Sequence, residues 1–449
     1  MLKKQALTII LALLLAAMLV ACGGTSPTAT EIPVQDSATD STTAEPVEMP
    51  VTGEQTPLTV WTFEGESENF TSIIEDFETK HPNIKVEVVD IPESEYGTKV
   101  DTALIAGEPP DIGFINDDKW IASGKFLPIG DHLKAEGINI EDYNPGAMTV
   151  NCLVEGEAYC IGTFTGALML FYNKDILDAA GIEYPSATVP LSMDQYAALA
   201  EAVTKEGATL ADSVWGADTD IGVWWQDRRN FFSEDGRTVD GYLNDEATVH
   251  MFEKLIEMRE AGAIIQGNST MAAEGFASQD MLASGQLATS ILEADLGIKM
   301  LENTDIRWGV APVPVEQAGD EPWTATWTDA YGVFSEADHP EAAMEFVSYM
   351  ATEGNNLRVQ QGIMPLKNTL GAEWAGESEG RQQAVQVIAL ARPGILVPGF
   401  WDIIGPLWDA YEGDMLEDGR PPQEVLDEYV PILQETLDQA WDTWDSFKE

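Results

Sequence analysis

The stretch Leu58–Pro92 reads LTVWTFEGESENFTSIIEDFETKHPNIKVEVVDIP and contains the pattern that decides the fold. Leu58–Phe63 is an apolar and β-branched run typical of a strand, and Ile84–Ile91 alternates apolar and polar residues as a second strand. Between them, residues 69–80 repeat apolar side chains at helical spacing and stop before a proline. A strand, a helix and a strand in this order predict two parallel strands joined by a right-handed crossover.

The same alternation continues along the chain. A helix near residues 96–106 leads to DIGFI at 111–115, which predicts a third parallel strand. About 390 residues follow residue 57, which is more than one core normally holds and indicates two lobes. Further helices are predicted at 174–180, 192–204, 245–261 and 279–284, further strands at 168–173, 288–292, 308–313 and 331–334, and a mostly helical part from 381.

The N-terminus has the features of a secretion signal. Two lysines precede an apolar run that ends in LVAC, residues 19–22. A single membrane-spanning helix is the alternative, but LVAC resembles the lipobox of bacterial lipoproteins, in which the leader is removed before a lipid-bearing cysteine. We therefore expect a signal peptide at 1–21, lipid on Cys22, and a location outside the cytoplasmic membrane. Residues 22–57 lack aromatic and basic residues and are expected to form a disordered tether.

The charge balance limits the partners. The chain has 77 acidic and 23 basic residues and a formal net charge of -54. Nucleic acid and anionic lipid surfaces are poor partners for such a surface. The excess acid is best interpreted as a solvated surface.

Cys152 and Cys160 remain when Cys22 is assigned to lipid. They flank the sequence LVEGEAY symmetrically about Gly156. Outside the cell this spacing predicts a structural disulfide across a hairpin whose turn is Glu155–Glu157.

Signatures of catalysis are weak. The four histidines are scattered, no metal-ligand spacing occurs, and no phosphate or dinucleotide motif is present, so neither a metal nor a cofactor is expected. GESEG at 376–380 matches the hydrolase motif GxSxG, but no strand precedes it. Glu64 with Glu66, or Asp117 with Asp118, could act as the acid and base of a glycosidase, and this alternative stays open.

Planar acceptors and aromatic residues gather where two predicted parallel strands end. Glu64 and Glu66 follow the first strand, and Asn116 and Asp117 follow the third, with Trp120 close behind. Open parallel sheets bind ligands outside the carboxyl ends of their strands. Carboxylates and amides pair with hydroxyl groups and indoles cover the C–H faces of a pyranose, so this composition suits a sugar.

Five stretches in order resemble the sugar-binding proteins of ATP-driven importers, the group that includes maltose-binding protein. They are Leu58–Pro92, AGEPPDIGFINDD with ASGKFLPI, GEAYCIGTFTGALMLFYNKDILDAAGIEYP, ASGQLATSI with WGVAPVP, and DAYGVFSEADHPEAAMEFVSYM. The resemblance implies the two-lobe α/β fold of type II periplasmic binding proteins, each lobe a sheet flanked by helices, with crossing segments as the hinge. It places one lobe at 58–165 plus 325–370 and the other at 166–324 plus 371–449.

The resemblance also implies a function without catalysis. A monomeric receptor would capture a sugar by hinge closure and deliver it to the permease of an ABC importer. The ligand positions carried over are Glu64, Glu66, Asn116, Asp117, Thr165, Gly166, Trp224, Trp225, Trp327, Asp329 and Trp401. The chain departs from the family at Glu293 and Asp295, which stand where a stacking platform is common, and these two acids join the candidate site. They motivate the second alternative, a receptor for a cationic solute such as a polyamine.

Overall fold

The computed structural model describes residues 55–63, 67–207, 213–219, 222–225, 228–265 and 278–447. The predicted signal peptide, Cys22 and nearly all of the tether lie outside these residues. The first strand begins at Thr56, so the predicted tether extended two residues too far.

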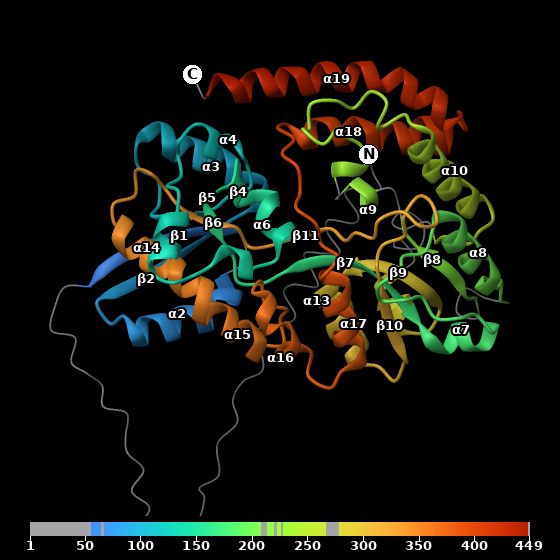
Figure 1. The fold of residues 1–449 in the computed structure, drawn as a ribbon, viewed down its shortest axis with the longest axis horizontal. Coiled ribbons are helices and arrows are strands. Elements are labelled where there is room, and N and C mark those ends of the chain that lie inside the picture. The colour runs from blue at the N-terminus through green and yellow to red at the C-terminus, as the bar shows by residue number, and fades with distance from the viewer. Residues whose placement is uncertain are drawn as a thin grey trace, which may run out of the picture. The chain divides into compact units, whose positions relative to one another are not determined.

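The predicted strand–helix alternation forms a first, five-stranded sheet (Figure 1). Its strands run in the order β2-β1-β3-β12-β6, with β1, β2 and β3 parallel and β12 antiparallel to both of its neighbours. The parallel arrangement predicted from the sequence is therefore confirmed. The strands are β1 (Thr56–Phe63), β2 (Ile84–Ile91), β3 (Ile112–Phe114), β6 (Cys160–Ile161) and β12 (Tyr331–Val333). The helical segments of this half are α2 (Ser67–Lys80), α3 (Glu93–Ala106), α4 (Lys119–Ala122), α5 (Gly130–Ala135), η2 (Ile140–Asp142), α6 (Pro145–Asn151), α14 (Pro340–Tyr349), η5 (Met350–Gly354) and α15 (Asn355–Gln360).

The helices of the first half cover the sheet with the apolar faces that their periodicity predicts. Phe70, Ile73 and Phe77 of α2 are buried in one core with strand residues such as Val60 and Ile112. Helix α3 ends at Gly107, whose φ of 71° is a left-handed conformation that glycine adopts without strain. Because β1 and β3 are parallel, the loop after β3 begins at the edge of the sheet where β1 also ends.

The second sheet has the strand order β10-β7-β9-β8, and β11 pairs with the start of β7. Its strands are β7 (Gly166–Asn173), β8 (Trp215–Asp218), β9 (Leu287–Glu293), β10 (Trp308–Ala311) and β11 (Thr326–Trp327). The helical segments are α7 (Lys174–Ala180), α8 (Met193–Val203), α9 (Gly222–Trp225), η4 (Arg228–Asn230), α10 (Glu246–Glu260), α12 (Ser278–Ala283), α13 (Ala294–Glu302), η6 (Asn368–Leu370), α16 (Gly371–Ala375), α17 (Glu379–Ile388), α18 (Phe400–Asp409), η7 (Ala410–Glu417) and α19 (Pro422–Ser446).

Strand β7 is the centre of this half, and both of its faces are covered. Leu170 and Tyr172 face the core that contains α8, α10 and α19, while Met169 and Phe171 face a second core with α13 and α17. This explains why the stretch LMLFYN is apolar without interruption. The capping box predicted for α8 is present, since Ser192 and Gln195 each bond the other's backbone N–H.

Two crossing segments are tied together by a buried carboxylate. Asp329 accepts hydrogen bonds from the Thr163 backbone N–H at 2.6 Å and the Thr163 hydroxyl at 2.7 Å. Arg358 of α15 lies 3.7 Å from the same carboxylate and donates to the Thr163 hydroxyl. These bonds hold residues 162–165, which lead into β7, against residues 328–330, which lead into β12.

The predicted disulfide is present between Cys152 and Cys160. The hairpin strands β4 (Leu153–Val154) and β5 (Glu157–Ala158) lie between the two cysteines. Since Glu157 pairs with Val154, the turn contains two residues rather than the predicted three. Both turn residues have positive φ, 53° for Glu155 and 85° for Gly156, as a type I′ turn requires.

Within the described ranges, the structure contains no helix that is both long enough and apolar enough to span a membrane.

Candidate ligand-binding site

A cavity of about 1000 Å³ lies where segments of the two halves meet. The first half contributes the ends of β1 and β3 with the loop that follows, and the crossing contributes the segment around β11. The second half contributes η4, the connection from α17 to α18, and the last turns of α19. This volume is large enough for a small-molecule ligand of several rings.

The loop after β3 supplies acceptors. Asn116 and Asp117 line the cavity, as expected from their position at a strand end. Asp117 is held by Lys119, whose backbone N–H donates at 3.0 Å and whose Nζ lies 2.8 Å from Oδ2. Lys119 also contacts Asp101 of α3 at 3.2 Å, so the acceptor loop is anchored to the helix beside it.

Aromatic rings line the cavity from several elements. Phe63 and Phe114 end the two strands, with ring centres 4.5 Å apart. Trp327 lies over the backbone of β7 and a Cβ at Gly166 would stand 2.3 Å from its ring, so only glycine fits there. On the second half, Trp401 is 68% exposed and packs edge to face on Phe400 at 5.1 Å. An indole so exposed at a cavity wall is available for stacking.

Asp118 and Arg228 approach the cavity from opposite halves and affect each other. Burial raises the pKa of Asp118 to about 6, while Arg228 acts to lower it and Asp117 raises it further. Burial lowers the pKa of the Arg228 guanidinium, and Asp118 counteracts this. The two groups are therefore partly desolvated opposite charges within electrostatic reach of each other.

Only some of the predicted site residues line the cavity. Asn116, Asp117, Trp327 and Trp401 line the cavity. Thr165 is buried and donates to the Pro365 carbonyl, and Gly166 makes room for Trp327, so both shape the crossing rather than the cavity wall. Asp329 is the buried link described above. Glu64, Glu66 and the Trp225 side chain lie outside the described residues.

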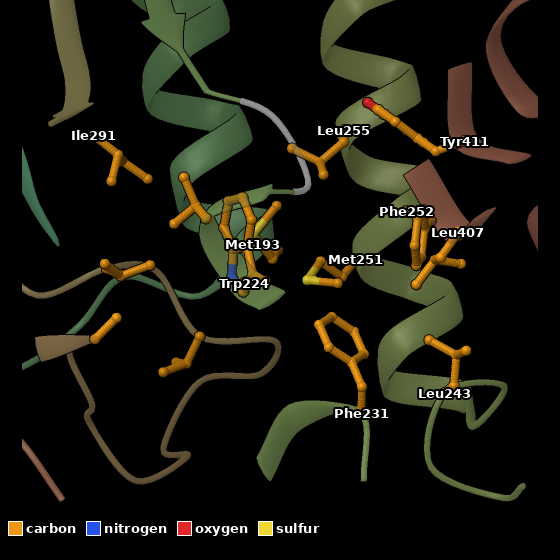
Figure 2. Close-up of a cluster of buried hydrophobic side chains, with 14 of the residues drawn as sticks. Met193, Trp224, Phe231, Leu243, Met251, Phe252, Leu255, Ile291, Leu407 and Tyr411 are labelled. Carbon is orange, nitrogen blue, oxygen red and sulfur yellow. The ribbon is translucent and has the colours of Figure 1, made fainter. Parts of the chain in front are cut away.

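Trp224 lies in the interior of the second half. Figure 2 shows its indole among Met193 and other apolar side chains, and its Nε1 donates to the Pro314 carbonyl at 2.9 Å. Trp224 and Trp225 are the last two residues of helix α9. With a fully buried ring, Trp224 is not part of the cavity wall.

Glu293 and Asp295 stand at the start of α13 and do not line this cavity. Glu293 caps the helix by accepting from the Leu296 N–H at 2.7 Å, and Asp295 accepts from the Met364 N–H at 3.4 Å. Burial raises the pKa of both carboxyls, that of Asp295 to about 6. Their hydrogen bonds give them a structural role at the crossing.

Several cavity residues were missed by the sequence analysis. Arg228, Arg392, Phe400, Trp444 and Phe447 come from four segments that are distant in the sequence from the predicted loops. A sheet-edge argument finds residues that follow strands. It has no signal for side chains that helices and irregular connections bring to the cavity.

Motifs for other chemistry are absent from the described part of the chain. No group of three His, Cys, Asp or Glu side chains is placed there to hold a metal ion. The GESEG stretch has no strand before it, and Ser378 caps helix α17 by accepting from the Arg381 N–H. A nucleophile elbow requires a strand-to-helix turn, so this interpretation is excluded.

The chain belongs to the family of bacterial extracellular solute-binding proteins, whose family model matches residues 63–357. A curated relative is the arabinooligosaccharide-binding protein of Bacillus subtilis, 24% identical over 315 residues, which cover 67% of this chain and 71% of that protein. Among solved structures, the ABC substrate-binding protein of Listeria monocytogenes in complex with cycloalternan has a TM-score of 0.70 at 20% identity, covering 86% of this chain and 100% of that one. The sugar-binding protein MalE of Xanthomonas citri has a TM-score of 0.69 at 17% identity, covering 88% and 100%. The predicted type II periplasmic-binding-protein fold is thereby confirmed.

Proposed function

We propose that this protein is an extracytoplasmic receptor that captures an oligosaccharide in the cavity and delivers it to an ABC importer. The observation that carries the proposal is the cavity itself, in which planar acceptors of the loop after β3 are combined with the exposed indole of Trp401. Hydroxyl groups pair with the acceptors and the apolar face of a sugar ring stacks on the indole. The sugar ligands named for the relatives support the same class of ligand.

Hinge closure is the proposed mechanism. Asn116 and Asp117 stand on one half, Trp401 stands on the other, and the crossing segments join the halves. A ligand that contacts both halves favours the closed arrangement over the open one. In this proposal the lobes are residues 58–165 plus 325–370 and 166–324 plus 371–449, and the unliganded receptor is a monomer.

Glu64 and Glu66 belong to the proposed site because they follow β1, whose last residue, Phe63, lines the cavity. Lipid on Cys22 and the tether would hold the receptor near its permease. Replacing Cys22 with Ala should move the protein from the membrane fraction to the medium or periplasm. Persistence in the membrane fraction would contradict the anchor and leave the ligand class untouched.

Binding without catalysis fits this site better than glycoside hydrolysis. In a glycosidase one carboxyl group protonates the glycosidic oxygen and the second attacks the anomeric carbon or activates a water there, whereas Asp117 is already paired with Lys119. Incubating the protein with arabinotriose or maltotriose and analysing the products by chromatography tests this. Release of shorter sugars at catalytic turnover would favour the glycosidase.

Calorimetric titration of the full chain tests the ligand class directly. Arabinotriose, maltotriose, putrescine and spermidine are compared, and we expect heat only from oligosaccharides. A micromolar Kd corresponds to a binding free energy of about 8 kcal/mol. Binding of the amines alone would instead support the cationic-solute receptor.

Trp401→Ala should weaken sugar binding about tenfold or more, since it removes a stacking platform. Because the ring is 68% exposed, the variant should keep its melting temperature. Tyr242→Ala is the matched control, an aromatic residue that is 41% exposed and does not line the cavity. Equal affinity in the two variants would remove Trp401 from the site.

A further inference from the structure

Asp118 occupies a helix start without capping the helix. It is the N-cap residue of α4, yet its side chain accepts no capping hydrogen bond. Among the described residues no ion pair reaches its carboxylate, whereas the neighbouring Asp117 is paired with Lys119 at 2.8 Å. The carboxylate instead lines the cavity and is only partly exposed.

Arg228 is held in place on the opposite wall. Its Nη1 donates to the Ile395 carbonyl at 3.2 Å, and the guanidinium carbon lies 4.7 Å from the centre of the Phe400 ring. A guanidinium has five N–H donors, and within the described residues this is its one hydrogen bond to protein. The side chain is thus oriented by this bond and by stacking, and its other donors bond no residue that the structure describes.

The other charged groups around the cavity do not replace this pair. Lys119 is bound to Asp117 and Asp101, and Arg392 lies 3.6 Å from Glu321. Glu93 and Asp402 are exposed at the rim, where water screens them. Asp118 and Arg228 are partly desolvated charges, one on each half, that form no ion pair with a described residue.

We propose that Asp118 and Arg228 are completed by the ligand, and that together they select a neutral polyhydroxyl ring against cationic and anionic relatives of that ring. This inference rests on the proposed function. A sugar hydroxyl donates to the carboxylate, and a hydroxyl or ring oxygen of the same ligand accepts from the guanidinium. An ammonium group would meet Arg228, and a uronate would meet Asp118, so each charged ligand gains one partner and repels the other.

The experiment compares three ligand types by calorimetry on the full chain. Arabinotriose and maltotriose serve as neutral probes, trigalacturonic acid as the anionic probe and the glucosamine trimer as the cationic probe. For wild type we expect binding of a neutral probe and at least tenfold weaker binding of both charged probes.

Asp118→Asn and Arg228→Gln should each weaken the neutral probe about 10- to 100-fold, the loss of a hydrogen bond to a charged group. They should also shift preference in opposite directions. Asp118→Asn should improve the ratio of uronate to neutral affinity about tenfold, and Arg228→Gln should do so for the glucosamine trimer. Asp131→Asn, which removes an exposed carboxylate of α5 that does not line the cavity, is the matched control and should change neither ratio.

The outcomes separate the two proposals. If wild type binds no carbohydrate, the proposed function fails and this inference fails with it. If wild type binds a neutral probe but both variants keep its affinity and ratios, this inference alone is overturned. If the neutral affinity falls while neither ratio shifts, the pair supports the fold of the site without selecting charge, which also overturns it. Melting temperatures identify a variant that has not folded, and Asp118→Glu and Arg228→Lys then replace it.

Discussion

The carboxylate of Asp118, which we propose binds the ligand, should destabilise the protein when no ligand is bound. Its carboxylate is partly desolvated beside the cavity, and no ion pair with a described residue compensates for this. Charged groups placed for a ligand are commonly suboptimal for the free protein, because the interactions that would satisfy them are reserved for the complex. The free protein should therefore be more stable without this charge.

The pH dependence of Asp118→Asn tests that cost. Burial raises the folded-state pKa of Asp118 from an ordinary 3.8 to about 6, despite the opposing effect of Arg228, and Asp117 adds to the rise. The unfolded chain releases this proton near pH 4 and the folded chain near pH 6, so this residue's contribution to stability is present below pH 4 and lost as the pH rises to 6. The variant should match wild type near pH 4 and exceed it by about 1 kcal/mol at pH 7.5, discounted for partial exposure.

Urea unfolding without ligand at pH 4, 5, 6 and 7.5 measures this difference. Arg228→Gln removes the attraction that lowers the pKa of Asp118. When Asp118→Asn is added to Arg228→Gln, the increase in unfolding free energy over Arg228→Gln alone should therefore develop at a higher pH. A difference between Asp118→Asn and wild type that stays constant across the four pH values would contradict the argument.

Among the predicted ligand residues, Asp329 shows why residue type alone does not define a role. A carboxylate beside a hinge strand was expected to face the ligand. The structure buries it against Thr163 and Arg358, where it joins two crossing segments. Residue spacing along one segment could not reveal Arg358, because the pairing depends on a helix about thirty residues downstream packing under the crossing.

At the scale of elements, most of the fold was predictable because each element carries a local signal. The apolar periodicity of α2, the capping box of α8 and the uninterrupted apolar run of β7 all matched their structures. Helix α9 at Gly222–Trp225 was not among the predicted elements, because four residues are too few to show a helical periodicity. The acceptor loop after β3 was predictable from its strand, whereas Arg228 and the C-terminal helices reach the cavity only through tertiary packing.

The disulfide hairpin is the element whose contribution can be measured most simply. Cys152 and Cys160 are fully buried, so alanine replaces them without burying a new polar group. Cys152→Ala/Cys160→Ala should lose about 2–3 kcal/mol of unfolding free energy, because the crosslink closes a short loop in the unfolded chain. Urea denaturation under non-reducing conditions measures it.

Dithiothreitol provides the control for this variant. It should lower the stability of wild type towards that of the double variant and leave the double variant unchanged. An equal response of both proteins to the reductant would show that the crosslink does not stabilise the fold.

At the scale of the whole molecule, helix α19 connects the second half to the first. Figure 1 shows α19 running along α18 and ending near α3 and α4. Trp444, only 2% exposed, belongs to the core of the second half, and Ala122 and Val154 of the first half pack against that core. Trp444 also lines a smaller cavity with Ile121. The last turns of α19 therefore add an apolar contact between the halves, outside the crossing segments.

Trp444→Ala should weaken this contact and shift the unliganded receptor towards a more open arrangement. The expected result is a larger radius of gyration by small-angle X-ray scattering without sugar, and weaker sugar binding, since closure must then form without that contact. Loss of a buried indole should also cost about 3–5 kcal/mol of stability. The loss of stability by itself would not identify a contact between halves, so a second tryptophan is needed.

Trp441 lies three residues earlier in the same helix and provides that comparison. It is 7% exposed, donates to the Gly236 carbonyl at 2.8 Å, and lies under the Arg237 guanidinium at 3.9 Å, all within the second half. Trp441→Ala should cost a similar amount of stability and leave the unliganded radius of gyration unchanged. Because the two substitutions remove the same side chain from one helix, a change in radius confined to Trp444→Ala would assign α19 a role in closure. The same radius in both variants would restrict hinge control to the crossing segments that Asp329 ties together.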